Sequence, residues 1–256
     1  ADEAADGVAG EGKGRGALGQ WRSVLGPMGK RIYVPTRGPE DWQRLLADPV
    51  KHWKAGYSAR LLAECWEAAD GWPPEVAAVL RSSPVAALTQ VELVLAIPEF
   101  PVSLPPRGKA SQSDLFALGK AADGQLVTMV VEGKADEPFG PTLAEWTVAS
   151  TPGKTTRLQY LTRLLGLPDE LPRDIRYQLL HRAASALILA TRFNARYTLM
   201  LVHSFSSSRA WFEDYQAFVR LFDAKGTGFD QLQWLAYRNG ITLYTGWVSG
   251  ALQYPQ

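Results

Sequence analysis

The sequence predicts an α/β fold with a mixed central sheet, and three features support this prediction. Residues 113–118 and 126–134 are apolar runs of strand length joined by turn residues, which predicts an antiparallel hairpin. Residues 196–205 are almost continuously apolar, as in a strand that is buried on both faces. The long helical pattern over 172–193 comes before this strand and predicts a crossover connection that returns the chain to the sheet.

The composition is that of a globular protein with a small net charge. At 256 residues, 46% of them hydrophobic, the chain can bury a sizeable core. A net charge of +1 provides no global attraction for nucleic acid, so such binding would depend on a local basic patch. The single cysteine, Cys65, excludes an internal disulfide framework and favours a reducing, cytoplasmic location. No apolar run approaches the roughly 20 residues that span a bilayer, so no membrane association is expected.

One domain is expected after a short tail. Residues 1–20 alternate Gly, Ala and charged residues without periodicity, which predicts a disordered tail. Residues 21–256 are expected to form a single α/β domain. Its parts are a helical N-terminal part over 21–85, a core over 86–205, and a C-terminal helix and hairpin over 206–256.

The N-terminal part is predicted to be helical. A helix is expected from Gly38, and a second begins at Ser58, a good N-cap residue, and ends at the Gly71–Pro74 break. Helical spacing continues over 75–80. These helices precede the strands of the core.

The segment that leads into the hairpin is predicted to be a helix followed by a strand. Residues 86–97 are strongly apolar around a single acid, Glu92, and Pro98 ends the segment. Residues 101–104 then predict a first strand. Glu92 would project from the helix, either toward the sheet or into solvent.

Later elements follow the same logic. A helix is expected over 151–165, and Gly166 is expected to end it. An amphipathic helix is expected over 211–222. Asn239-Gly240 joins two strand patterns in a closing hairpin. Three aromatic residues of this hairpin either stack on nucleic-acid bases or pack in a core or dimer interface: Trp234, Tyr244 and Trp247.

Three charged residues interrupt the apolar hairpin. Asp114 opens its first strand, and Glu132 and Lys134 close its second strand two residues apart, on one face. Two carboxylates and one ammonium are costly to bury unless they bind something. Mg²⁺ prefers hard oxygen ligands and commonly uses one or two protein carboxylates. The hairpin therefore predicts a Mg²⁺ (or Mn²⁺) site.

Asp114 followed by Glu132-Gly133-Lys134 resembles the PD-(D/E)XK signature of the restriction-endonuclease-like nucleases. The resemblance implies that Asp114 and Glu132 hold the metal, that Gly133 lends its backbone carbonyl, and that Lys134 positions the attacking water. It also implies a restriction-endonuclease-like core over 86–205. Ser113 stands where the signature has proline.

The same resemblance implies further site residues. An acid on the helix before the hairpin often completes the metal shell, which points to Glu92. The helix after the hairpin lies against the active-site side of the sheet, which points to Gln178, Arg182 and Arg176 as groups that contact the substrate or support the metal ligands. Gln178 and Arg182 are four residues apart and so share a face. Salt bridges on the helix surface are the alternative role for each.

Over most of its length the sequence also resembles an uncharacterised bacterial protein family, in blocks at 56–60, 132–142 and 174–184. That resemblance implies no activity.

The predicted function is a Mg²⁺-dependent phosphodiesterase, an endonuclease that acts on nucleic acid, with DNA favoured over RNA because the superfamily mostly cleaves DNA. Alanine at Glu132 or Lys134 is expected to abolish cleavage and leave the fold nearly intact. Two alternatives stay open: a catalytically inactive scaffold that binds nucleic acid or a protein partner, and a hydrolase of small phosphoesters. The oligomeric state, a homodimer included, also stays open.

Overall fold

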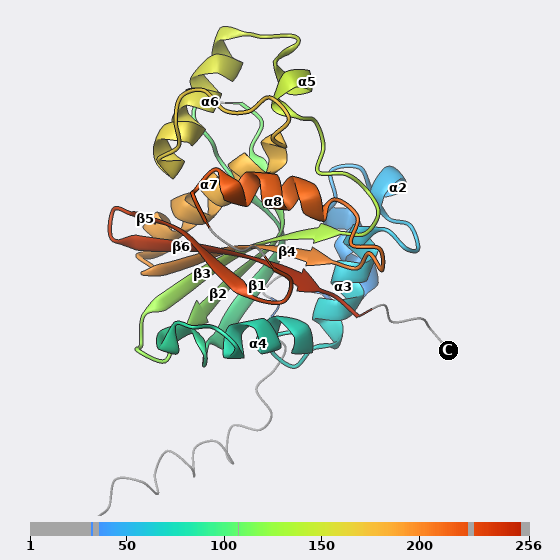
Figure 1. Ribbon diagram of the computed structural model, residues 1–256. Helices are drawn as coiled ribbons and strands as arrows, with labels where there is room; N and C mark the ends of the chain where they lie inside the picture. The colour runs from blue at the N-terminus through green and yellow to red at the C-terminus, as the bar shows by residue number, and fades with distance from the viewer. Residues whose placement is uncertain (1–31, 33–35, 107, 225–227, 252–256) are drawn as a thin grey trace, which may run out of the picture. The chain divides into compact units, whose positions relative to one another are not determined.

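The computed structural model describes residues 32, 36–106, 108–224 and 228–251. The tail expected over 1–20 lies outside these residues. The chain from Arg31 to Gln256 clusters as one compact unit, in which helices cover both faces of a central sheet (Figure 1). Within the described part of the chain, no helix combines the length and apolar composition needed to cross a membrane.

The sheet has six strands in the order β1-β2-β3-β4-β6-β5. They are β1 (Glu92–Val102), β2 (Ser111–Lys120), β3 (Leu126–Lys134), β4 (Tyr197–Ser204), β5 (Leu232–Arg238) and β6 (Ile241–Ser249). β1, β2 and β3 form an antiparallel meander. β4 is parallel to both β3 and β6, and β5 pairs antiparallel with β6. The prediction of a mixed sheet is confirmed.

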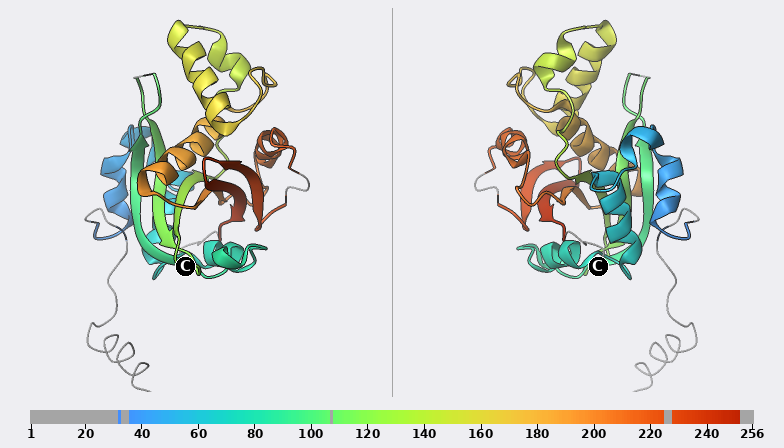
Figure 2. Two further views of the ribbon diagram at one scale, coloured as in Figure 1. Left: turned by 90° about the vertical axis from the view of Figure 1, so that its left-hand side faces the viewer. Right: turned by 90° about the vertical axis from the view of Figure 1, so that its right-hand side faces the viewer.

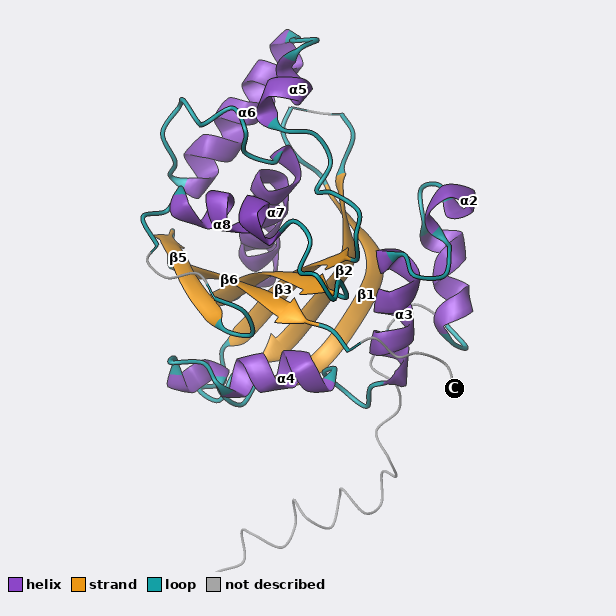
Figure 3. Cartoon of the chain, turned by 45° about the vertical axis from the view of Figure 1, so that its right-hand side comes forward, coloured by secondary structure: helices purple, strands orange, loops and turns teal. Residues whose placement is uncertain are grey.

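Seven α-helices and two 3₁₀ helices surround the sheet in the described residues. The helical elements are η1 (Pro39–Leu45), α2 (Pro49–His52), α3 (Ser58–Ala68), α4 (Pro74–Arg81), η2 (Ala86–Leu88), α5 (Leu143–Thr147), α6 (Pro152–Leu165), α7 (Tyr177–Phe193) and α8 (Phe212–Arg220). α7 and α8 pack on one face of the sheet, whereas α3 and α4 pack on the other (Figures 2 and 3).

The central strands are apolar on both faces because each face has its own core. In β3, Val130 packs in the core under α7, while its neighbours Met129 and Val131 pack in the core under α3 and α4. Side chains alternate between faces along a strand, so a strand covered on both sides has few polar positions. Glu132 and Lys134 are both buried, and they stand out against this background.

The helix expected over 86–97 is wrong. Only the 3₁₀ turn Ala86–Leu88 is helical there, and Glu92 begins strand β1. β1 alternates between exposed and buried positions at its start, and it continues through Pro98 and Pro101. Proline is tolerated because β1 is an edge strand, where one side of the backbone needs no ladder partner.

The long helical pattern over 172–193 is shorter in the structure, because α7 begins only at Tyr177. Arg176 instead forms an isolated bridge with Thr142, which holds the preceding segment extended. The helices beginning at Ser58 and ending before Gly166, the buried strand β4, and the closing hairpin around Asn239-Gly240 are confirmed.

α5 and α6 form an insertion between β3 and α7, and α6 packs on the side of α7 that faces away from the sheet (Figure 3). Arg157 of α6 ties this insertion to the connection between β1 and β2. Its guanidinium donates to the carbonyl oxygens of Leu104, Pro106 and Lys109 at 2.8–3.1 Å.

Candidate active site

The end of the β2–β3 hairpin positions Asp114 beside Gly133. The last backbone pair between these strands is Leu115 with Val131, so Asp114 lies just beyond the ladder. At this position the Asp114 carboxylate, rather than a backbone carbonyl of β2, accepts the hydrogen bond from the Gly133 N–H, at 2.8 Å. In an extended strand the N–H and C=O of one residue point to the same neighbouring strand, so the Gly133 carbonyl is also directed to the Asp114 side.

Glu132 lies at the centre of a buried cluster of charges. Its Oε1 accepts hydrogen bonds from Lys134 Nζ at 2.6 Å and from Gln178 Nε2 at 2.7 Å, and its Oε2 accepts from Arg182 Nε at 2.5 Å. Burial raises the pKa of Glu132, but the Arg182 guanidinium and the Lys134 ammonium outweigh burial and hold that pKa at about 2. Glu132 is therefore ionised across the physiological range.

Asp114 responds in the opposite direction to the same surroundings. Burial raises its pKa to about 7, with a further contribution from the Glu132 charge, although Arg182, Lys134 and the Gly133 N–H all lower it. Arg182 Nη2 lies 3.5 Å from Asp114 Oδ1, too far for a strong hydrogen bond. Two neighbouring carboxylates thus differ widely in their affinity for a proton, which is common at functional sites.

The sequence patterns missed a third carboxylate, Glu99. It falls between the β1–β2 pairs Pro98 with Leu115 and Phe100 with Ser113, and therefore lies across from Asp114. Gln112 Nε2 donates to Glu99 Oε2 at 2.8 Å. Burial and, to a smaller extent, the Asp114 charge together raise the pKa of Glu99 to about 8. The antiparallel pairing of β1 with β2 was the information needed to find it, and the helix predicted over 86–97, with its end at Pro98, concealed that pairing.

Helix α7 delivers two polar side chains to Glu132, as the four-residue spacing of Gln178 and Arg182 predicts. The same helix is anchored to β2 through Ser111. Arg182 Nη1 donates to Ser111 Oγ at 2.9 Å, and the Ser111 hydroxyl lies 2.8 Å from His181 Nδ1. Burial and the adjacent Arg182 charge lower the pKa of His181 well below its usual value, so His181 is neutral. Arg182 is thereby fixed between the two strands.

The structure places the other two predicted residues outside this cluster. Arg176 pairs with Asp214 at 2.8 Å and donates to the Gly140 carbonyl at 2.7 Å, which connects the start of α7 to α8. Glu92 pairs across β1 and β2 with Lys120, at the opposite end of the strand from Glu99. The other predicted residues, Asp114, Glu132, Gly133, Lys134, Gln178 and Arg182, come together.

The donor set fits a divalent cation with hard oxygen ligands. Glu99, Asp114 and Glu132 supply carboxylate oxygens, and the Gly133 carbonyl is directed to the same side. When all are ionised, these three acids outnumber the neighbouring cations, Lys134 and Arg182, by one charge. A cation would compete with Arg182 for Asp114, and the 3.5 Å separation of that pair makes the competition weak.

A second group of metal-ligating residue types lies under the other face of the sheet. Cys65 Sγ and His203 Nε2 lie 3.1 and 3.0 Å from Glu75 Oε1. However, the Trp66 indole N–H donates to His203 Nδ1 at 3.4 Å, so the ring hydrogen resides on Nε2 and points at Glu75. Burial raises the pKa of the Cys65 thiol, which keeps it protonated. The group is a closed chain of hydrogen bonds, a poor starting point for metal binding.

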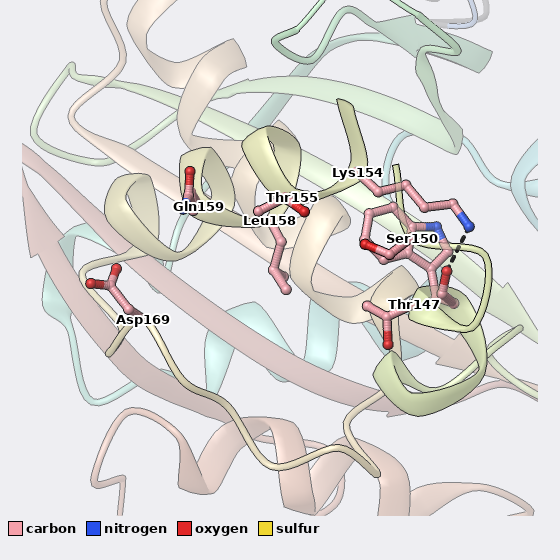
Figure 4. Close-up of a pocket in the computed structure, with 8 residues that line it drawn as sticks. Thr147, Ser150, Lys154, Thr155, Leu158, Gln159 and Asp169 are labelled. Carbon is pink, nitrogen blue, oxygen red and sulfur yellow. Dashed lines mark hydrogen bonds between the residues drawn. The ribbon is translucent and has the colours of Figure 1, made fainter. Parts of the chain in front are cut away.

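A pocket of about 220 Å³ lies between α5 and α6 (Figure 4). Its lining consists of Trp146, Thr147, Ser150, Lys154, Thr155, Leu158, Gln159 and Asp169. Lys154 Nζ donates to the Trp146 carbonyl at 2.6 Å, as the dashed line in Figure 4 marks. The pocket contains none of the residues of the carboxylate cluster.

The aromatic residues of the closing hairpin divide between core and surface. Trp247 is fully buried and packs edge-on against Phe139 and Phe212, and Tyr244 is also buried. Trp234 remains 49% exposed. Core packing therefore accounts for two of the three, and a three-ring surface for stacking bases is not formed.

Fold and site define a class of protein: a mixed α/β protein that holds a buried cluster of carboxylates and cations at the end of its β2–β3 hairpin. Within that class, the chain belongs to the family described as a domain of unknown function (DUF6946), whose model matches residues 35–252. No curated protein and no solved structure matches the chain.

Proposed function

We propose that the protein is a Mg²⁺-dependent phosphodiesterase of the restriction-endonuclease-like class, an endonuclease that acts on DNA. The observation that carries the proposal is the convergence of Asp114, Glu132 and Lys134 at one end of the β2–β3 hairpin. Their order and spacing are those of the PD-(D/E)XK signature. A signature this short gains weight when its residues meet in space.

The arrangement of elements supports the same proposal. In the class that the signature resembles, the helix after the hairpin lies against the active-site side of the sheet. Helix α7 packs on β3 and β4 and directs Gln178 and Arg182 to Glu132. The chain then continues into β4, parallel to β3.

Each residue has a role in hydrolysis under this proposal. Asp114, Glu132 and the Gly133 carbonyl would hold Mg²⁺, which, when bound, stabilises negative charge on the phosphate oxygens. Lys134 holds its ammonium group beside the carboxylates, 5.0 Å from the centre of the Phe139 ring, and orients water by donating a hydrogen bond. Gln178 and Arg182 donate hydrogen bonds to Glu132 and so support a metal ligand.

One observation favours a second function, a catalytically inactive scaffold that binds nucleic acid or a protein partner. The two oxygens of Glu132 already accept hydrogen bonds from three side chains. A carboxylate satisfied by internal donors stabilises a fold without any metal. The two functions differ in whether the cluster binds a divalent cation.

Cleavage of supercoiled plasmid and single-stranded DNA with Mg²⁺ or Mn²⁺ tests the proposal. The informative variant is Asp114→Asn, because an asparagine oxygen can still accept the Gly133 N–H. Asp70→Asn, at an exposed position between α3 and α4, makes the same chemical change as a control. The proposal expects metal-dependent cleavage that Asp114→Asn abolishes and Asp70→Asn retains. Cleavage that survives in Asp114→Asn contradicts it, and a wild-type protein that neither cleaves nor binds Mn²⁺ favours the scaffold.

A further inference from the structure

The position of Glu99 follows from strand pairing. The β1–β2 register pairs Pro98 with Leu115 and Phe100 with Ser113, which leaves Glu99 across from Asp114. Because the Glu99 backbone is left-handed (φ 51°), its side chain is located by the hydrogen bond from Gln112, which lies two residues before Asp114 and on the same face of β2. Asp114, Arg182 and Glu132 are accordingly the charged groups that act on Glu99.

The charges of this cluster do not balance. Glu99, Asp114 and Glu132 are three carboxyl groups, and Lys134 and Arg182 are the cations that contact them. Buried carboxylates without full compensation are unfavourable, and they either keep a proton or bind a cation. The excess negative charge is therefore met either by a proton on Glu99 or Asp114 or by a bound cation.

The carboxylates also differ in how many hydrogen bonds they already accept. Glu132 accepts from Lys134, Gln178 and Arg182. Glu99 accepts one hydrogen bond from a described residue, from the Gln112 amide at 2.8 Å. The oxygens best able to accept a new cation are therefore on the β1–β2 side of the cluster.

We infer that Glu99 is the third carboxylate of the cation site, so that a hard divalent cation binds between Glu99 and Asp114, displaced from Glu132 toward β1. This inference rests on the proposed metal-dependent function and adds to it a residue outside the Asp114, Glu132 and Lys134 set. Glu132 remains a ligand on the far side of this site and also holds Lys134 and Arg182 in place.

Mn²⁺ binding measured by electron paramagnetic resonance tests the inference without reference to cleavage. The variant Glu99→Gln keeps the size of the side chain and retains an oxygen that accepts the Gln112 hydrogen bond. A purely structural role for Glu99 would therefore survive the change. Glu170→Gln, at an exposed position in the connection after α6, removes the same charge elsewhere and serves as the control.

We expect Glu99→Gln to weaken Mn²⁺ affinity by about tenfold or more, as is typical when a group around a metal is lost. Glu170→Gln should bind as the wild type does, and circular dichroism should show both variants folded. Unchanged Mn²⁺ affinity in Glu99→Gln, with loss of binding in Asp114→Asn, would overturn the role of Glu99 and leave the proposed function standing. Failure of the wild-type protein to bind Mn²⁺ would overturn both.

Discussion

Glu132 compensates two cations that have little contact with solvent. The side chains of Lys134 and Arg182 are each 5% exposed, and Glu132 is 1% exposed. Removing one partner of a buried ion pair leaves an uncompensated charge, which is far more harmful than losing a surface pair. The expectation that alanine at Glu132 leaves the fold intact therefore does not follow from the structure.

We predict that Glu132→Ala lowers the free energy of unfolding by about 3–5 kcal/mol, the usual cost of breaking a buried ion pair. Urea unfolding at neutral pH measures it. The matched control is Glu64→Ala, because Glu64 pairs with Arg60 at 2.8 Å in a half-exposed position. That variant should lose no more than about 1 kcal/mol. Equal losses in the two variants would show that the cluster around Glu132 is hydrated and weak.

The raised pKa values of Asp114 and Glu99 predict that stability falls as the pH rises. In the folded state these groups keep a proton up to about pH 7 and pH 8, whereas in the unfolded chain they lose it near 3.8 and 4.5. The folded protein thus binds more protons in this range, and its stability declines with pH. His181 opposes the decline only below its ordinary pKa of 6.5, because its own pKa is lowered. The lowered pKa values of Glu132 and Glu75 change the stability only between about pH 2 and 4.5, outside this range.

The decline should therefore be steepest between about pH 6 and 7.5, at about 1 kcal/mol or more per pH unit, and should fade above pH 8 as Glu99 ionises. Chemical unfolding across this range measures it. In the double variant Asp114→Asn with Glu99→Gln the slope should disappear. A wild-type stability that is flat or rising over the same range would show that both carboxyl groups ionise normally.

At the scale of single residues, the sequence could identify the site where chemistry and spacing coincide. Asp114, Glu132 and Lys134 are charged residues at the ends of apolar strands, so they were visible without a structure. Glu99 was not, because its position in the site depends on the pairing of β1 with β2. Arg176 could not be separated from Arg182 by pattern, since both lie in one cationic segment and only their contacts differ.

Among the secondary-structure elements, strands β2 and β3 each contain one glycine, and the two glycines have very different surroundings. A Cβ at Gly119 would lie 2.6 Å from Val91 Cγ1 and 3.1 Å from the Glu92 carbonyl oxygen. A Cβ at Gly133 would meet Leu62 Cδ2 at 3.4 Å and Asp114 Oδ2 at 3.5 Å, which is ordinary contact. The first strand position is therefore tightly packed, and the second has room for a methyl group.

We predict that Gly119→Ala destabilises the protein by about 1–3 kcal/mol, because overpacking forces neighbouring groups apart. Gly133→Ala should leave stability within about 1 kcal/mol of the wild type, since a smaller entropy of the unfolded chain favours alanine. Thermal unfolding of the two variants side by side measures the difference. If Gly133→Ala were the more damaging change, the position of Leu62 over β3 would have to differ from the one described.

The elements that could be predicted from sequence have their determinants close together in the chain. Gly166 ends α6 and Asn239-Gly240 specifies a tight turn, so these elements are found as expected. Helix α3 does begin at Ser58, but its N-cap is Tyr57 rather than the serine. β1 failed for a tertiary reason. Its apolar residues are not spaced strictly by two, because the register with β2 shifts between Leu93 and Leu95, and a helix fits such a run equally well.

At the scale of the whole molecule, the crossover through α7 predicted that β4 returns to the sheet, and it does so next to β3. The strand order on the far side, with β6 inside and β5 at the edge, was not predictable, because a hairpin can join a sheet by either of its strands. The burial of the two strands explains which of them joins the sheet. β6 is buried along most of its length and pairs with β4, whereas β5 exposes Trp234 and Tyr237 and lies at the edge.

The small net charge of the molecule bears on how it would bind DNA. With a net charge of +1 there is no global field to attract a polyanion, so binding must come from a few local cations. Each neutralised phosphate steepens the dependence of affinity on salt by nearly one unit in a plot of log affinity against log salt. A protein that contacts few phosphates therefore has a shallow slope.

We predict a slope of magnitude below about 4 for binding of a short DNA duplex, measured by fluorescence anisotropy with Asp114→Asn so that cleavage does not interfere. A slope of about 8 or more would reveal an extended basic surface. The protein would then contact the substrate at many phosphates rather than only at the carboxylate cluster. No measurable binding to duplex or single-stranded DNA, together with turnover of a small phosphodiester by the wild-type protein, would instead identify a small-molecule phosphoesterase. The metal site would be the same in that case, because the cation responds to the phosphate group and not to the length of the chain that carries it.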